Sequence, residues 1–224
     1  IMRRILQATG VEVIHLGHNR SVDEIVTAAL QEDVQGIALS SYQGGHVEYF
    51  KYMVDLLRER GGANIKVFGG GGGVIVPAEI AELHDYGVAH IYSVQDGQKL
   101  GLQGMINDMV MRCDVDLSHV ATSDVSALQA ANARTRERNL SQIITALENK
   151  AWPEASRAAL LSINGASPAP TDEMHRCVSL GITGTGGAGK SSLTDEIIRR
   201  IRLDLEDALK IAVISIDPSR RRTG

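Results

Sequence analysis

One stretch of the sequence has the residue types and the spacing that bind phosphate groups. Residues 184–191, GTGGAGKS, fit the pattern GxxxxGK[ST], between a predicted strand and a predicted helix. Glycines let consecutive backbone N–H groups turn toward an anion, and a helix beginning at Lys190 adds its positive end. We expect the Lys190 ammonium to reach the terminal phosphates of a nucleotide and the Ser191 hydroxyl to bind Mg²⁺.

A second group of residues follows the next predicted strand, 211–216, and could complete the magnesium site. Asp217 ends this strand, and a carboxylate in that position commonly contacts Mg²⁺ directly or through water. The alternative is an ordinary Asp-Pro-Ser turn. Arg220, Arg221 and Arg222 could contact phosphate, although a solvated run of charge is the favoured interpretation. The motif alone predicts nucleotide binding and leaves the base undetermined.

Three loops rich in small residues form another candidate ligand site. Their sequences are SSYQGGH at 40–46, five glycines at 69–73, and SVQDG at 93–97. Ligands in open α/β sheets bind outside the carboxyl ends of the strands, and small residues there leave a slot that large side chains would close. The glycine run could instead be a flexible connection, but the rigid elements predicted on both sides argue against a hinge.

The elements that must position these loops alternate along the chain. We predict strands at 11–16, 36–40, 65–68 and 88–93, and helices at 21–32, 47–60, 77–86 and 98–112, after a first helical stretch at 1–9. This order is typical of a parallel sheet with right-handed crossovers. A flavodoxin-like sheet has five strands in the order 2-1-3-4-5. We therefore expect the first strand to precede Ile1 and the chain to be part of a longer polypeptide.

The predicted fold class is α/β, with three regions. Residues 1–112 form the flavodoxin-like domain, residues 113–175 a helical linker that contains the Ser/Pro/Ala-rich stretch 162–171, and residues 176–224 the start of a P-loop NTPase domain. The NTPase region has predicted strands at 177–183 and 211–216 and a helix at 190–202 between them.

Composition excludes several classes of protein. The formal net charge is −4 at pH 7, so there is no basic footprint for nucleic acid. No apolar run approaches the ~20 residues needed to cross a bilayer. Two cysteines do not make a disulfide framework, which favours a reduced, cytoplasmic setting.

The first domain resembles the cobalamin-binding domains of acyl-CoA mutases and methionine synthase, whose motifs are DxHxxG, SxL and GG. Ser40-Ser41-Tyr42 corresponds to SxL, with Tyr42 in place of Leu, and Gly72-Gly73 corresponds to GG. The histidine of DxHxxG, the lower axial cobalt ligand of the family, is expected before Ile1. The cobalamin-binding residues that this resemblance and the loop argument assign are Ser40, Ser41, Tyr42, Gly44, Gly45, Gly70, Gly71, Gly72, Gly73 and Ser93.

The second domain resembles the G-protein chaperones of these mutases, and the two domains in one chain resemble the family of fused isobutyryl-CoA mutases. The resemblance implies adenosylcobalamin, GTP and Mg²⁺ as cofactors. It implies that Lys190 serves GTP hydrolysis and that Mg²⁺ is held by Ser191, the carbonyl of Ile216, and Asp217. The implied nucleotide contacts are Gly187, Ala188, Gly189, Lys190, Ser191 and Ser192.

The same resemblance implies the reaction and the partners. The reaction is the radical rearrangement of the carbon skeleton between isobutyryl-CoA and n-butyryl-CoA, with the GTPase gating cofactor loading. The acyl-CoA would bind a barrel domain outside this chain, and the protein would be a homodimer without nucleic-acid or membrane partners.

Two other functions fit the same residues less well. A stand-alone, GTP-dependent cobalamin chaperone or sensor would have both domains but no mutase activity. A signalling protein with a receiver-like domain would need a phospho-acceptor Asp at a strand end, where this chain has Ser40, Gly69 and Ser93.

Overall fold

The computed structural model describes residues 2–42, 44–117, 119–121, 124–165, 178–209 and 211–215. The chain divides into two compact units, Ile1–Ala166 and Ser167–Gly224. In chain order the elements are α1 (Met2–Ala8), α2 (Val22–Gln31), β1 (Gly36–Ser40), α3 (His46–Glu59), β2 (Lys66–Gly70), α4 (Pro77–Tyr86), β3 (His90–Tyr92), α5 (Val94–Cys113), the 3₁₀ helix η1 (Val125–Gln129), α6 (Ala133–Glu148), α7 (Glu154–Gly165) and α8 (Lys190–Asp204).

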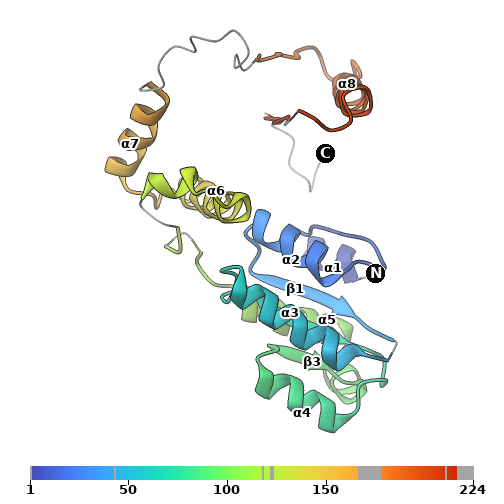
Figure 1. Ribbon diagram of the computed structural model, residues 1–224. Coiled ribbons are helices and arrows are strands. Elements are labelled where there is room, and N and C mark those ends of the chain that lie inside the picture. The colour runs from blue at the N-terminus through green and yellow to red at the C-terminus, as the bar shows by residue number, and fades with distance from the viewer. Residues whose placement is uncertain are drawn as a thin grey trace. The chain divides into compact units, whose positions relative to one another are not determined.

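The first unit is built on a parallel sheet of three strands in the order β1-β2-β3 (Figure 1). Ser40 is opposite Gly70, and Gly70 is opposite Tyr92, so all three strands end at the same edge. Both pairings are parallel, as the alternation of strands and helices predicted. The α/β fold class is thereby confirmed, with three strands in the described residues.

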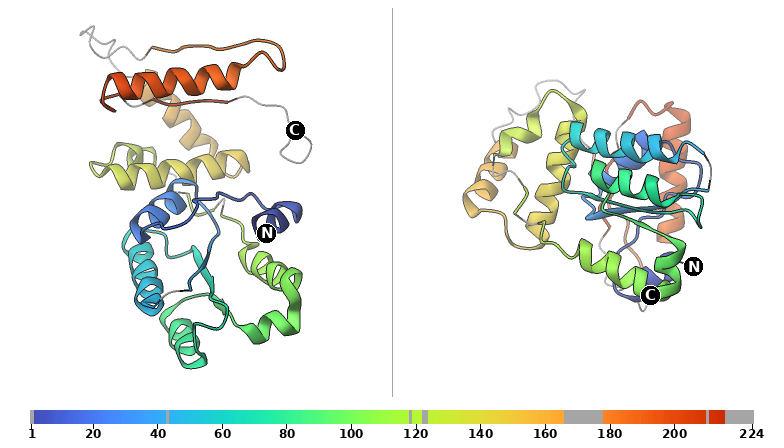
Figure 2. Two further views of the ribbon diagram at one scale, coloured as in Figure 1. Left: turned by 90° about the vertical axis from the view of Figure 1, so that its right-hand side faces the viewer. Right: turned by 90° about the horizontal axis from the view of Figure 1, so that it is seen from below.

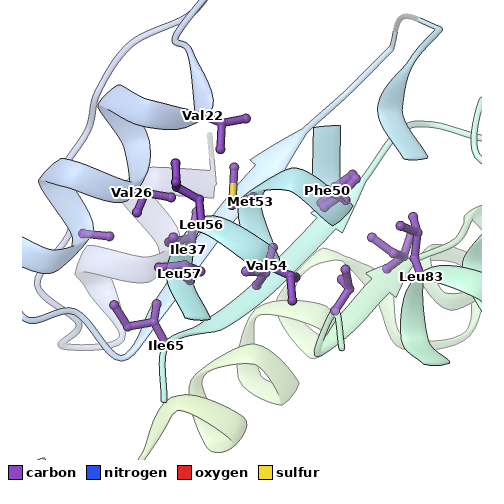
Figure 3. Packing of buried hydrophobic residues seen from close by; sticks show 14 of the residues in the cluster. Val22, Val26, Ile37, Phe50, Met53, Val54, Leu56, Leu57, Ile65 and Leu83 are labelled. Carbon is purple, nitrogen blue, oxygen red and sulfur yellow. The ribbon is translucent and has the colours of Figure 1, made fainter. Parts of the chain in front are cut away.

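Helices cover both faces of this sheet. The hydrophobic core joins residues of α2, α3 and α4 to β1 and β2, with Phe50 and Met53 of α3 fully buried (Figure 3). The other face carries α5, which contacts α1 (Figure 2). A β-carbon added at Gly36 would lie 2.7 Å from Cys113 Sγ and 3.2 Å from Phe68 Cε2, which places these two side chains together on the α5 face.

Local sequence signals explain where the helices begin and end. Ser21 and Glu24 form the predicted capping box of α2: the Glu24 N–H donates to Ser21 Oγ at 3.2 Å, and the Ser21 N–H donates to Glu24 Oε2 at 2.9 Å. Pro77 is the first residue of α4, where its missing N–H costs nothing. Gly61, with φ of 78°, follows the end of α3 in the left-handed conformation that favours glycine.

Three predicted strands are absent or incomplete in the structure. Residues 11–16, 178–183 and 211–215 have no regular secondary structure; the remainder of the strands predicted at 177–183 and 211–216 lies outside the described residues. A β-strand is stable only beside a hydrogen-bonding neighbour, and no described strand pairs with these segments. Their side chains are correspondingly exposed, Val178 to 88% and Ile214 to 89%. The apolar, β-branched sequence of these segments was therefore not sufficient to make them strands.

Several element boundaries also differ from prediction; for example, the strand predicted at 88–93 is the shorter β3, His90–Tyr92. β2 extends to Gly70, two residues beyond the predicted end, so the glycine run begins inside the sheet. The last helix of the domain begins at Val94 rather than Gln98, because Ser93 and Asp96 form a capping box. Gly101, with φ 65° and ψ 174°, interrupts this helix.

The helical segment after α5 has a small core of its own within the same unit. Ile143 and Ala146 of α6 are buried together with Trp152, against partly buried residues of η1 and α7. α6 also packs on α2 of the sheet domain. Among the described residues, no helix is long and apolar enough to cross a membrane.

We predict that Gly69→Ala destabilises the first unit by about 1–3 kcal/mol, the usual cost of overpacking a core. A β-carbon at Gly69 would lie 2.3 Å from Phe50 Cζ and 2.6 Å from Ile91 Cδ1. The measurement is the urea midpoint of unfolding. Gly44→Ala is the control, because a β-carbon there meets no atom within 4 Å. Equal midpoints for the two variants would contradict the packing described.

Candidate functional site

The parallel register brings the predicted slot loops together at one edge of the sheet. Ser41 directly follows β1, and its N–H donates to the carbonyl of Gly70 at 2.9 Å, which extends the ladder by one residue. Ser40 is the last residue of β1, opposite Gly70. Ser93 follows β3 at the same level, since Tyr92 is opposite Gly70. The structure therefore places all three loops side by side.

Three glycines of the run are needed by the backbone at this edge. A β-carbon at Gly71 would lie 2.4 Å from the Ser41 carbonyl oxygen, so the two loops cross at backbone contact. Gly72 and Gly73 have φ of 55° and 92°, in the left-handed region. The turn closes with the Val74 N–H donating to the Gly71 carbonyl at 3.0 Å. The glycine run is thus a tight turn, not a flexible connection.

Tyr42 and Gly72 lie against each other at the predicted slot. The Tyr42 side chain is 67% exposed, and a β-carbon at Gly72 would lie 2.9 Å from Tyr42 Cε1. A β-carbon at Gly73 would lie 3.2 Å from Val94 Cγ2, at the start of α5. Side chains added at Gly72 or Gly73 would therefore fill the space between Tyr42 and α5.

The remaining predicted residues have different surroundings. Gly45 caps α3 in the left-handed conformation, and a β-carbon at Gly44 or Gly45 would meet no atom within 4 Å. These two glycines line open space rather than a close crossing. The Ser93 hydroxyl donates to Asp96 Oδ2 at 2.7 Å and accepts from the Asp96 N–H at 3.1 Å. These bonds hold the hydroxyl in its capping role. The pKa of Asp96 lies below its ordinary value, first because its carboxylate accepts the Ser93 backbone N–H at 2.8 Å and then because it accepts the Ser93 hydroxyl.

Sequence reasoning missed a side-chain hydrogen bond next to the predicted slot. His46 is the first residue of α3, one residue before the predicted helix start, and its Nε2 lies 2.9 Å from Glu79 Oε2 at the start of α4. The same oxygen accepts the Val76 N–H at 2.9 Å. The pKa of Glu79 is lowered first by the Val76 N–H and then by His46. This pair joins the helices that follow the first two slot loops; a histidine beside a glycine pair at a helix start was its only signal.

The phosphate loop of the second unit has the backbone geometry of an anion site. Gly187 and Gly189 have φ of 76° and 75°, and α8 begins at Lys190. The Lys190 ammonium folds back over the loop and donates to the Thr185 carbonyl at 2.7 Å. A β-carbon at Gly186, Gly187 or Gly189 would meet no atom within 4 Å. The space next to these three glycines is therefore open.

The predicted metal ligands are only partly described. Ser191 and Ser192 lie in the first turn of α8 and are exposed, next to Lys190. Ile216 and Asp217 lie outside the described residues. In the part of the chain that the structure covers, no group of three or more His, Cys, Asp or Glu side chains could hold a metal ion.

Comparison with known protein families assigns both parts of the chain. Residues 1–93 match the B12 binding domain, and residues 140–224 match the methylmalonyl-CoA mutase-associated GTPase MeaB. The MeaB match begins inside α6. The predicted domain limits at 112 and 175 stay predictions.

Individual relatives match over the entire chain. The fused isobutyryl-CoA mutases of Cupriavidus metallidurans, Geobacillus kaustophilus and Nocardia farcinica are 66%, 55% and 54% identical to it over 225, 228 and 224 residues. The match covers 100% of this chain and 19%, 20% and 20% of those relatives. The chain thus spans about a fifth of the length of these proteins.

We predict that Glu79→Gln lowers the thermal midpoint by a few degrees at pH 7 and has no effect near pH 3. Because folding lowers the pKa of Glu79, its carboxylate stabilises the fold above the ordinary glutamate value and loses this contribution as the pH falls through the folded value. The measurement is thermal unfolding at both pH values. Glu59→Gln, at the exposed C-terminal end of α3, is the control. A midpoint difference for Glu79→Gln that is the same at both pH values would contradict the assignment.

Proposed function

The chain joins a B12-binding domain to the first part of a MeaB-type GTPase region, and from this premise we propose that it is part of an adenosylcobalamin-dependent acyl-CoA mutase interconverting isobutyryl-CoA and n-butyryl-CoA. The observation that supports the proposal is the combination, in one chain, of the B12-binding match and the MeaB match. The names of the relatives support the choice of acyl group.

The slot residues fit the flat nucleotide tail of cobalamin. At Gly71 any side chain would meet the Ser41 carbonyl, and at Gly72 and Gly73 added side chains would meet Tyr42 and Val94. Backbone walls of this kind allow the dispersion contacts that a planar, largely apolar ring can make. The residues that would hold the cofactor are Ser40, Ser41, Tyr42, Gly44, Gly45, Gly70, Gly71, Gly72, Gly73 and Ser93. When bound, adenosylcobalamin supplies the carbon-centred radical chemistry of the rearrangement.

The second unit would bind Mg·GTP. The backbone N–H groups from Gly187 to Ser192 and the positive end of α8 would face the phosphates, and Lys190 would exchange the Thr185 carbonyl for a phosphate oxygen. Ser191, the Ile216 carbonyl and Asp217 would hold Mg²⁺. Hydrolysis of GTP in this region would gate the loading of cofactor into the first domain.

The acyl-CoA substrate would bind a barrel domain outside this chain. The intact protein would be a cytoplasmic homodimer. The direct test is conversion of isobutyryl-CoA by the intact protein loaded with adenosylcobalamin. Cofactor binding without conversion would favour the stand-alone chaperone or sensor.

We predict that Gly73→Leu in the intact protein weakens adenosylcobalamin binding at least tenfold and leaves GTP affinity unchanged, because the side chain would fill the slot. The measurement is a titration followed by the cobalamin absorption spectrum. Gly61→Leu is the matched control, since Gly61 also has a positive φ, 78°, but lies in open space beyond the end of α3. Wild-type affinity in Gly73→Leu would refute the slot.

We also predict that Lys190→Ala abolishes Mg·GTP binding and spares cobalamin binding, because it removes the cation that would meet the terminal phosphates. Isothermal titration with a non-hydrolysable GTP analogue measures the loss. Arg199→Ala, an exposed arginine on the same helix that pairs only with Glu196 among the described residues, should bind GTP normally. An unchanged GTP affinity in Lys190→Ala would exclude the assignment.

A further inference from the structure

A buried ion pair fixes α6 on the sheet domain. Arg138 Nη1 of α6 donates to Asp33 Oδ1 at 2.5 Å, and the two side chains are 5% and 1% exposed. Asp33 follows α2 and has a φ of 46°, so the backbone is held in an uncommon conformation that turns the chain from α2 toward β1. Neither the cobalamin slot nor the phosphate loop includes these residues.

Further polar contacts surround the pair. Arg138 Nη2 donates to Asn64 Oδ1 at 3.3 Å, just before β2. Ser141, one turn later in α6, donates to the carbonyl of Leu30 at 2.7 Å. Gln31 at the end of α2 donates to Glu137 of α6 at 3.0 Å. Hydrogen bonds therefore join α6 to two connections of the sheet domain, one after α2 and one before β2.

The contact has a cost that apolar packing would not have. Within the described residues, Asp33 Oδ2, Asn64 Nδ2 and Arg138 Nε are buried without a hydrogen-bond partner. Buried ion pairs contribute little to stability in comparison with apolar packing, and their best-attested role is to fix the register of two elements. Another face of α6 packs in its own apolar core, through Ile143 and Ala146. One face of α6 thus holds its helical segment together, and the other sets the position of that segment on the sheet domain.

The family boundary lies within this helix. The B12-binding match ends at residue 93 and the MeaB match begins at residue 140, between Arg138 and Ser141. Ser141, which bonds to the end of α2, lies within the MeaB match, and Arg138 lies just before it on the same helix. The helix that begins the GTPase match is therefore the helix that contacts the cobalamin domain.

We propose that Arg138 is a positioning residue that docks the start of the GTPase region on the cobalamin domain, and that this dock transmits the effect of bound nucleotide to the cobalamin slot. The second half of the inference rests on the proposed function, in which GTP gates cofactor loading. The dock reaches the predicted slot through β1 and β2, because Asp33 and Asn64 lie in the connections that lead into the two strands whose far ends carry Ser40 and Gly70.

The test compares three variants of the intact protein. Arg138→Met removes the charge and keeps a long side chain. Asp33→Asn with Arg138→Met removes both charges, and asparagine tolerates the positive φ of this position. Arg134→Met, one turn earlier on α6, is the matched control, because Arg134 is 57% exposed and reaches Asp23 at 3.6 Å. For each, adenosylcobalamin affinity is measured with and without a non-hydrolysable GTP analogue, together with the thermal midpoint and amide exchange in α2.

We expect a nucleotide effect on cobalamin affinity in the wild type and in Arg134→Met, and at least a fivefold smaller effect in Arg138→Met, with GTP affinity itself unchanged. The double variant should regain thermal stability without regaining the nucleotide effect. If the double variant regained both its thermal stability and the nucleotide effect, the ion pair would have only a structural role, and the proposal would be overturned. A full nucleotide effect in Arg138→Met would also overturn it and leave the proposed function intact.

Two further results separate the halves of the proposal. Faster amide exchange at the end of α2 in Arg138→Met, but not in Arg134→Met, would support the dock, whether or not nucleotide changes cobalamin affinity. Absence of any nucleotide effect in the wild type would overturn the proposed gating, and with it the transmission through α6.

Discussion

The parallel register of β1, β2 and β3 is the constraint on which the candidate cobalamin site depends. Because Ser40, Gly70 and Tyr92 lie on one line across the sheet, the loops that follow them must meet. They meet so closely that the Gly71 backbone crosses the Ser41 carbonyl, which no residue with a side chain could allow. The core beneath this edge, with Phe50 against Gly69, keeps the strands from shifting relative to α3.

Glycine serves different physical purposes at neighbouring positions of this edge. Gly69 makes room for a core aromatic ring, Gly71 permits a backbone crossing, and Gly72 and Gly73 supply left-handed turns. The sequence predicted a ligand slot from the run as a whole, and it could not separate these roles. The separation needs the register, since strand position decides that Gly69 faces α3.

Much of the sheet domain could be predicted because its signals are local. Ser21 with Glu24, and Pro77, mark helix starts whose hydrogen bonds lie within one turn, and the structure confirms both. The strands predicted at 11–16 and 177–183 are not found in the described residues 11–16 and 178–183, because a strand depends on a neighbour that can come from anywhere in the chain. The same limit applies to sites: His46 and Glu79 are far apart in the sequence, as are Asp33 and Arg138, and only the fold brings each pair together. The phosphate loop was predictable because all of its contacting groups belong to one short segment.

The core of η1, α6 and α7 contains the residue that dominates the fluorescence of the chain. Trp152 is the single tryptophan of the sequence, and it is 6% exposed between Ile143 and Ala146. Its fluorescence therefore originates in the helical segment of η1, α6 and α7, at a residue within the MeaB match, and nowhere in the sheet domain. Emission from a shielded indole shifts to longer wavelength when water reaches it. The emission maximum of Trp152 therefore reports on the packing of η1, α6 and α7, and not on the packing of the sheet domain.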